Sequence, residues 1–328
     1  MPDINLPYYV AVFALTFLLT VVIERVLIPR LIGRAEQPIY EDGPKWHKGK
    51  SGTPTMGGVA FLIAVTVALL LSALFLYLGG NSESAAALLL SLGYAVANSA
   101  VGIIDDLKKL KKKENAGLKP REKLLLQTLF SVLFLVGLHL TVQNPTLLSF
   151  SFGVLDIGIF YYPLALIILV GITNCANLTD GIDGLASGVA FAIGIMLFYI
   201  SCALCTEVCF ISAALMGATT GFLVFNLHPA RVFMGDTGSL FLGAIVAASC
   251  FALGNMLVAV FVGAVYVIEG VSVILQVLWF KLTNKRLFKM APLHHHLEKC
   301  GWSENRICIV AIIFTLICSL PALALYLP

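Results

Sequence analysis

The positive charges of this 328-residue chain are confined to alternate connections between its apolar segments. All 21 Lys and Arg residues lie in or beside those connections, and the intervening connections carry none. Because Lys and Arg are retained on the cytoplasmic side of a membrane, this bias predicts the orientation of every span. We therefore expect an integral membrane protein with cytoplasmic charged loops and with both termini on the outer side.

The apolar segments are long enough to cross a bilayer. Hydrophobic residues make up 59% of the chain and charged residues 12%, a composition far from that of soluble globular proteins. A helix needs about 20 apolar residues to cross the hydrocarbon core. We predict an all-α fold that forms a single domain over residues 1–328 and has ten transmembrane helices, at 6–28, 55–78, 85–104, 124–141, 157–173, 182–201, 208–225, 238–253, 256–280 and 307–326.

The first span is expected to stay in the mature protein. No positive segment precedes it, and Arg25, Arg30 and Arg34 follow it as in a stop-transfer sequence. The longest polar stretches are then residues 29–54, 105–123 and 281–306. Function is expected in these connections and in the helix ends that frame them.

Aspartates cluster at three places on the predicted cytoplasmic face. They end the third span and lie in the fifth and seventh connections: Asp105, Asp106, Asp180, Asp183 and Asp236. Carboxylates at a hydrocarbon boundary are costly to desolvate, so a cluster of them indicates a compensating cation. Mg²⁺ suits this ligand set, because it takes carboxylate and water oxygens and is often completed by substrate phosphates. An Asp-Gly pair alone is an ordinary turn, but three clusters favour a diphosphate site.

Three adjacent histidines, His294, His295 and His296, lie in the ninth connection. Adjacent side chains point about 100° apart on a helix and to opposite faces of a strand, so the three rings cannot readily share one zinc ion. We expect one or two rings to face the site as phosphate donors or proton carriers and the third to pack structurally. The alternative is a group of ordinary polar loop residues.

Other polar residues have simpler interpretations. Lys50, Lys109 and Lys123 lie beside the Gly-rich turn of residues 51–58 or follow the first aspartate pair, so we expect them to contact phosphate. Most of the run of lysines at 108–113 is expected to serve topology, and such cations also attract an anionic lipid headgroup.

The predicted outer side carries two local features. Cys202, Cys205 and Cys209 cluster near the end of a helical hairpin, and we expect small packing residues there rather than a metal site or a disulfide. Alternating Ser and Phe around Gly153 predict a small β-hairpin.

The order of these motifs resembles one family, the polyprenyl-phosphate N-acetylhexosamine-1-phosphate transferases. The matching blocks span nearly the whole chain and are HKGKSGTPTMGG from His47, Asp105-Asp106, NLTDGIDGLA from Asn177, NLHPARVFMGDTGSL from Asn226 and PLHHHLE from Pro292. GTPTMGG and PLHHHLE are similar to the muramoyl-pentapeptide branch of that family. Ile182 stands where Leu is commoner, which is a conservative change.

This resemblance implies Mg²⁺-dependent transfer of phospho-N-acetylmuramoyl-pentapeptide from its UDP derivative to undecaprenyl phosphate, giving lipid I and UMP. The expected partners are UDP-N-acetylmuramoyl-pentapeptide, undecaprenyl phosphate and the lipid bilayer of the bacterial inner membrane. No nucleic-acid partner is expected, and a homodimer is compatible with this interpretation. The active-site cleft would face the cytoplasm.

The resemblance also implies residue roles. Asp236 would be the metal ligand, and the catalytic residues would be Asp105, Asp106, Asp236, His294, His295 and His296. The substrate-binding residues would be Lys50, Thr55, Lys109, Lys123, Asn177, Asp180, Gly181, Ile182, Asp183, Asn226 and Phe233, with Gly181, Ile182, Asp183 and Asn226 at the uridine and Phe233 stacked on uracil. The family has a broken ninth helix, and Gly263, Glu269 and Gly270 are candidate points of interruption.

Some alternatives stay open. A lipid phosphate with a second pKa of about 6 is largely dianionic at neutral pH, which favours its direct attack on the diphosphate. Asp105 could then remove a residual proton, bind the metal through water, or act as a covalent nucleophile. A related transferase that uses UDP-N-acetylglucosamine would share the aspartates but differ in the histidine loop. A secondary transporter would carry ionisable groups at mid-membrane, where only Glu269 lies deep in a span.

Overall fold

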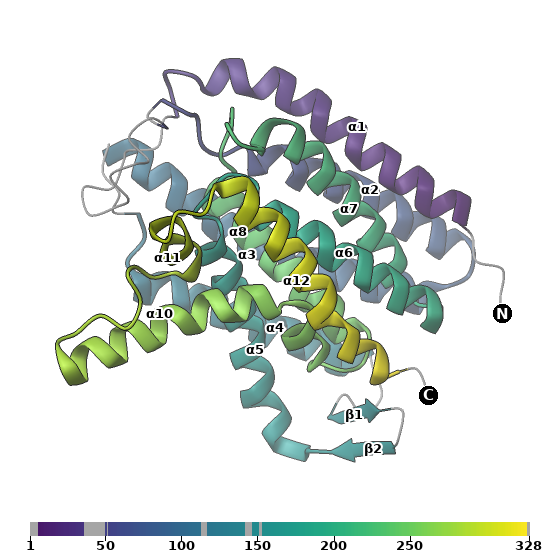
Figure 1. Ribbon diagram of the computed structural model, residues 1–328. Helices are drawn as coiled ribbons and strands as arrows, with labels where there is room; N and C mark the ends of the chain where they lie inside the picture. The colour runs from purple at the N-terminus through teal and green to yellow at the C-terminus, as the bar shows by residue number, and fades with distance from the viewer. Residues whose placement is uncertain are drawn as a thin grey trace.

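The computed structural model describes residues 6–35, 50, 52–112, 117–141, 146–150 and 153–326. Ten of the described helices are long and apolar enough to cross a membrane, which confirms the predicted all-α fold. They are α1 (Leu6–Leu31), α2 (Gly58–Leu78), α3 (Ser82–Lys112), α4 (Pro120–Thr141), α5 (Tyr161–Thr179), α6 (Leu185–Leu204), α7 (Val208–Asn226), α8 (Gly235–Ala252), α10 (Ala264–Thr283) and α12 (Glu304–Ala324). The start of α1 and the end of α12 lie at the same end of the bundle, as an even number of spans requires (Figure 1).

The centre of the bundle is α8, which packs against α3 and α5 and is the most buried of the ten spans. Glycines allow this close packing. A Cβ on Gly102 of α3 would collide with the backbone of Asp236, and one on Gly58 of α2 would collide with Gly238 of α8. Small residues at such contacts let helix backbones approach closely inside a membrane. The outer helices present apolar side chains to their surroundings, among them Leu18, Leu125, Ile167 and Leu278.

The predicted ninth span, residues 256–280, is broken. The short helix α9 (Val258–Val262) ends at Gly263, and α10 starts at the next residue and extends away from the bundle (Figure 1). Gly263 was therefore a correct candidate for the interruption. Glu269 and Gly270 were wrong candidates, because both lie inside α10. Gly270 has a packing reason instead, since a Cβ there would collide with the Cys175 thiol.

Two smaller predictions can also be compared with the structure. Strands β1 (Leu147–Phe150) and β2 (Gly153–Asp156) pair antiparallel in the register Phe150↔Gly153, which confirms the hairpin. Cys202, Cys205 and Cys209 are free thiols, and the Sγ atoms of Cys202 and Cys209 lie 3.4 Å apart. These sulfurs pack where α6 meets α7.

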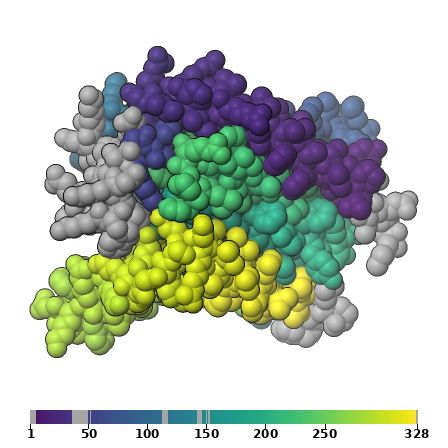
Figure 2. Space-filling view, turned by 45° about the horizontal axis from the view of Figure 1, so that its top comes forward, coloured from purple at the N-terminus to yellow at the C-terminus, as the bar shows by residue number. Residues whose placement is uncertain are grey.

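Along one side of the bundle, segments distant in sequence share one surface. Figure 2 shows the N-terminal segment, the region that follows α7 and the pair α11 (Leu293–Lys299) and α12 side by side. The aspartate-bearing turns of the chain lie at the end of the bundle opposite the start of α1 and the end of α12 (Figure 1). Part of the Gly-rich block that begins at His47 lies outside the described residues, but Lys50 and residues 52–58 are described.

Candidate active site

Three aspartates from α3 and α8 form the first side-chain cluster, which we call the α3–α8 cluster. One oxygen each from Asp105, Asp106 and Asp236 lies within 4.8 Å of the other two. Asp105 and Asp106 are each only 3% exposed, so their charges are largely removed from solvent. Such a group of carboxylates needs compensating positive charge.

Asp106 holds the start of α8. Its carboxylate accepts hydrogen bonds from the backbone N–H of Asp236 (3.1 Å) and Thr237 (2.9 Å), and from the Thr237 hydroxyl (2.7 Å). The first N–H groups of a helix have no partner within the helix and favour negative charge, so this contact is stabilising. Gly235, which has φ of +69°, brings the backbone close enough, because a Cβ there would lie 2.7 Å from Asp106 Oδ2 and 2.9 Å from the buried Thr55 hydroxyl.

The Asp236 carboxylate is surrounded by side chains that donate hydrogen bonds to it, two of which are positively charged. Its carboxylate contacts Lys123 Nζ at 2.8 Å and Lys109 Nζ at 3.1 Å, and accepts a hydrogen bond from the Asn177 amide at 3.0 Å. Lys109 also contacts Asp105 at 2.6 Å. Three carboxylates and two ammonium groups leave this cluster with a formal charge of −1, so it can accept a further cation.

The cluster fits Mg²⁺ by its donor chemistry. All the ligand atoms are carboxylate oxygens, which a hard divalent ion prefers. The oxygens of Asp106 already accept hydrogen bonds at the start of α8, whereas the described residues that hold the Asp236 carboxylate do so with side chains, which can move. Asp236 and Asp105 are therefore the residues best placed to hold the ion.

Asp180 lies in the turn between α5 and α6. Among the described residues its carboxylate has no hydrogen-bond or ion-pair partner. Burial raises the pKa of Asp180 well above its usual value, and the negative charges of Asp236, Asp106 and Asp183 raise it further while Lys50 opposes the shift. The ionised form of Asp180 therefore costs electrostatic free energy in the folded protein, and its surroundings do not offset this cost.

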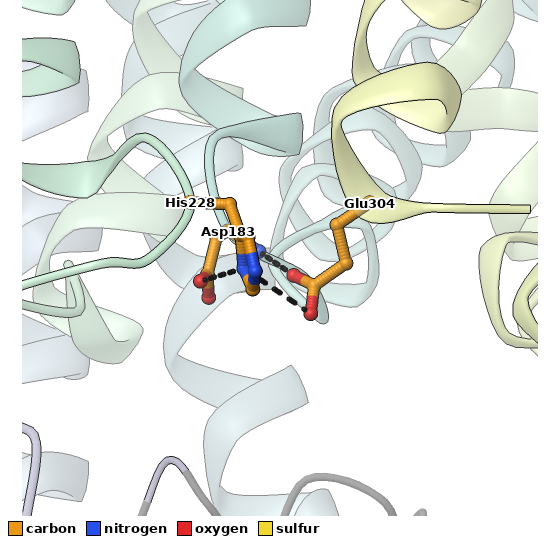
Figure 3. A group of neighbouring side chains, drawn as sticks. All are labelled: Asp183, His228 and Glu304. Atoms are coloured by element: carbon orange, nitrogen blue, oxygen red, sulfur yellow. Dashed lines mark hydrogen bonds and ion pairs between the residues drawn. The ribbon is translucent and has the colours of Figure 1, made fainter.

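A second cluster links three loops, and we call it the loop cluster. It contains Asp183, His228 and Glu304, with Lys50 between the two acids. Lys50 Nζ lies 2.7 Å from Asp183 Oδ1 and 2.7 Å from Glu304 Oε2. Figure 3 shows His228 between the two carboxylates, with Nδ1 at 2.9 Å from Asp183 and 3.6 Å from Glu304.

Backbone groups fix the loop cluster. Asp183 accepts a hydrogen bond from Ala230 N–H at 3.0 Å, and Glu304 accepts one from Asp183 N–H at 2.8 Å. Glu304 and His228 were absent from the predicted site residues. His228 stands inside the matching block that begins at Asn226, but no sequence signal distinguishes Glu304, the first residue of the last span.

The residues expected around uridine take different positions. Asn226 is buried, accepts hydrogen bonds from Gly184 N–H and Ser187, and donates to the Val232 carbonyl, so it ties the loop after α7 to α6. Ile182 is 4% exposed, so its side chain belongs to the core. Phe233 is half-buried and is held by backbone hydrogen bonds with Pro54 (2.8 Å) and Gly57 (2.9 Å).

The three histidines of α11 have three different environments. His294 is fully buried and pairs with Glu269 of α10. His295 Nδ1 lies 2.6 Å from Glu298, and His296 Nδ1 accepts a hydrogen bond from the Lys289 N–H at 3.1 Å. The rings are therefore not equivalent, as their adjacency in the sequence predicted.

This chain is similar to a known family of proteins over most of its length. The model of the glycosyl transferase family 4 matches residues 88–254, and a phospho-N-acetylmuramoyl-pentapeptide-transferase signature matches residues 50–62. Similar curated proteins carry the name phospho-N-acetylmuramoyl-pentapeptide-transferase. The protein of Halalkalibacterium halodurans is 43% identical over 298 residues, which cover 90% of both chains. The protein of Clostridioides difficile is 40% identical over 314 residues, which cover 94% of both chains. The protein of Heliobacterium modesticaldum is 45% identical over 274 residues, which cover 83% of both chains.

Proposed function

The chain belongs to the family of phospho-N-acetylmuramoyl-pentapeptide-transferases, and we propose that it makes lipid I from UDP-N-acetylmuramoyl-pentapeptide and undecaprenyl phosphate. An oxygen of the lipid phosphate forms a bond to the sugar-bearing phosphorus of the diphosphate. The bond from that phosphorus to the bridging oxygen breaks, and UMP leaves with the electron pair. The new diphosphate joins the lipid to the sugar.

The α3–α8 cluster is the single observation that carries this proposal. Asp236 and Asp105 would hold Mg²⁺, which neutralises charge on a diphosphate when it is bound. Lys109 and Lys123 contact Asp236, and their proposed role is to bind phosphate oxygens once a substrate enters. Positioning and electrostatic stabilisation are the main sources of acceleration in phosphoryl transfer.

Direct attack by the lipid phosphate is the mechanism that we favour. Asp105 is bound to Lys109 and to the Leu118 N–H at 2.6 Å, so its carboxylate is held in place by two donors. A carboxylate restrained in this way is poorly suited to move onto a phosphorus atom as a nucleophile. Its proposed role is to hold Lys109 and the metal.

We assign the loop cluster and its neighbours to the nucleotide. The turn before α6 contains or contacts Lys50, Asp183, Gly181 and Asn226, and Phe233 lies on the loop after α7. Thr55, Asn177, Asp180 and Ile182 complete the substrate-binding set, with Ile182 acting through its backbone. The active end is assigned to the cytoplasmic face of the bacterial cell membrane, and a homodimer stays a prediction.

Two assays test the proposal. Purified protein should release UMP from UDP-N-acetylmuramoyl-pentapeptide, but not from UDP-N-acetylglucosamine, and only when polyprenyl phosphate and Mg²⁺ are present. Labelled UMP should exchange into the nucleotide sugar only in the presence of lipid. Exchange in lipid-depleted protein that is lost in Asp105→Asn would instead show a covalent two-step route.

A further inference from the structure

Glu269 is an acid deep in α10 that the proposed chemistry does not use. It is 5% exposed, and the histidine it contacts, His294 at the start of α11, has no exposed surface. The Glu269 carboxylate accepts hydrogen bonds from the His294 backbone N–H at 3.2 and 3.3 Å, and it lies 3.1 Å from Nδ1 of the ring. Backbone and ring of His294 are thus fixed by one side chain from another helix.

The opposite edge of the ring faces the turn between α5 and α6. A Cβ on Gly181 would collide with His294 Nε2, so the ring lies directly against the turn backbone. Nε2 is buried and has no hydrogen-bond partner among the described residues. Buried polar atoms without partners are rare and cost about 1–3 kcal/mol each, so this one calls for a functional explanation.

The hydrogen-bond chemistry of the pair defines what Nε2 offers. The Glu269 oxygen that faces Nδ1 also accepts the His294 backbone N–H, so we take this oxygen as the acceptor and Nδ1 of His294 as the donor that carries a proton. In the neutral ring the other nitrogen is then an acceptor. Two titratable side chains among the described residues contact the ring, those of Glu269 and of His295, whose ring centroid lies 4.2 Å away, and Asp180 directly precedes Gly181 in the chain.

We propose that Glu269 is a positioning residue that holds His294 in the Nδ1–H tautomer and directs Nε2, as an acceptor, toward the Asp180–Gly181 turn. The ligand of Nε2 is then an N–H or O–H group of the nucleotide sugar and not a phosphate oxygen. This assignment of the ligand rests on the proposed function. Residue 181 has no side chain, so the proposal requires only a movement of the turn backbone to bring Nε2 into contact with this ligand.

Nitrogen NMR of protein labelled with ¹⁵N-histidine tests the tautomer directly. The chain has six histidines, and the His294 signals are those lost in His294→Gln. We expect Nδ1 protonated and Nε2 unprotonated in the wild type, a mixture of both tautomers in Glu269→Ala, and the wild-type tautomer in Glu269→Gln, whose side-chain oxygen can still accept from Nδ1–H. An Nε2–H tautomer in the wild type would overturn the proposal even if no variant folds.

Glu298 provides the matched control. Its carboxylate pairs with Nδ1 of the neighbouring ring, His295, at 2.6 Å. Glu298→Ala should therefore change the His295 signals and leave those of His294 in place. Equal changes in the His294 signals of both variants would mean that α11 as a whole had loosened, and would contradict a specific role for Glu269.

Titration with ligands tests the assigned acceptor role separately. UDP-N-acetylmuramoyl-pentapeptide, added without lipid, should shift the His294 Nε2 signal, and inorganic diphosphate should leave it unchanged. In turnover, Glu269→Ala should raise KM for the nucleotide sugar about tenfold with a smaller change in kcat, and Glu269→Gln should restore it. A shift of Nε2 by diphosphate alone would overturn the proposal. Failure of the protein to bind the nucleotide sugar would contradict the proposed function but not the tautomer result.

Discussion

The α3–α8 cluster and the loop cluster are built from the same kinds of side chain but hold them differently. In the α3–α8 cluster, Asp105 and Asp106 also accept backbone N–H groups, but the contacts that the described residues make with the Asp236 carboxylate come from side chains, those of Lys109, Lys123, Asn177 and Asp105. In the loop cluster, the carboxylates of Asp183 and Glu304 pair with Lys50 and also accept backbone N–H groups.

This difference separates groups that can exchange partners from groups that fix the fold. Side-chain partners can rotate away when a cation or a phosphate binds, whereas a backbone donor moves only with its whole loop. We therefore expect substitutions of Asp236 and of its side-chain partners in the α3–α8 cluster to act on the chemical step. Substitutions in the loop cluster should act on the shape of the binding site, and hence on KM.

The largest effect is expected for Asp236→Asn. The amide keeps the shape of the side chain but loses the charge, so turnover should fall by about a thousandfold or more. UMP release over a range of Mg²⁺ concentrations measures this loss. Asp156→Asn, an exposed change in β2, should keep the wild-type rate. Normal activity of Asp236→Asn at ordinary Mg²⁺ concentrations, or wild-type activity in EDTA, would refute the metal assignment.

Lys123→Met should lower kcat about a hundredfold. The ammonium bridges Asp236 at 2.8 Å and the Asn177 side-chain oxygen at 3.2 Å, so its loss leaves the cluster with excess negative charge that opposes a diphosphate. The matched control is Lys108→Met, because Lys108 is exposed and pairs only loosely with Glu122 at 3.9 Å. Exposed ion pairs contribute little, so the control should retain its activity. Equal losses in both variants would argue for a general effect of surface charge.

Glu304→Gln should have a smaller effect and of another kind. The amide oxygen can still accept the Asp183 N–H, but the charge that holds Lys50 is gone. We expect KM for the nucleotide sugar to rise about tenfold while kcat changes less, as for loss of binding without loss of chemistry. Glu122→Gln, an exposed change, serves as the control. A fall in kcat with unchanged KM would erase the distinction between the two clusters.

The sequence was sufficient for the parts of the fold that depend on local pattern. Span length and alternating positive charge predicted all ten helices, and the pattern around Gly153 predicted the hairpin. Gly263 was identified as a break through the family resemblance. Glu269 and Gly270 were misplaced because a charge or a glycine within a span can equally reflect contacts with other helices, here with His294 and Cys175.

The roles within the site depend on contacts that no local pattern encodes. Glu304 lies 121 residues from Asp183 in the sequence, and only the packing of α12 beside α6 brings them together. In the sequence, Asp105 and Asp106 look equivalent. In the structure, Asp106 accepts hydrogen bonds from the start of α8, because Gly102 lets α8 approach α3 closely. Sequence therefore identified most of the residue set, but not which carboxylates accept backbone N–H groups.

Asp180 lies between the two clusters and gives the smallest predicted effect. Its pKa is raised in the folded protein by burial and by Asp236, Asp106 and Asp183. Between the unfolded value of about 3.9 and the raised folded value, the native state binds more protons than the unfolded state, so stability falls as pH rises. The loss of stability caused by the Asp180 charge is therefore absent below that pH range and fully present above it.

Asp180→Asn removes this cost and should therefore stabilise the protein while impairing its function. We expect the melting temperature at pH 8 to rise by about 2–4 °C, as for a gain of about 1 kcal/mol, and the difference from the wild type to vanish toward pH 4. Thermal unfolding in detergent at several pH values measures it, with Asp156→Asn as a control that shows no such pH dependence. Turnover should fall, because a residue kept at an energetic cost without a partner is typical of a binding site. The opposite result would be a variant whose melting temperature falls below that of the wild type at pH 8 but not at pH 4. The Asp180 charge would then stabilise the fold, and Asp180 would belong with the backbone-held acids of the loop cluster.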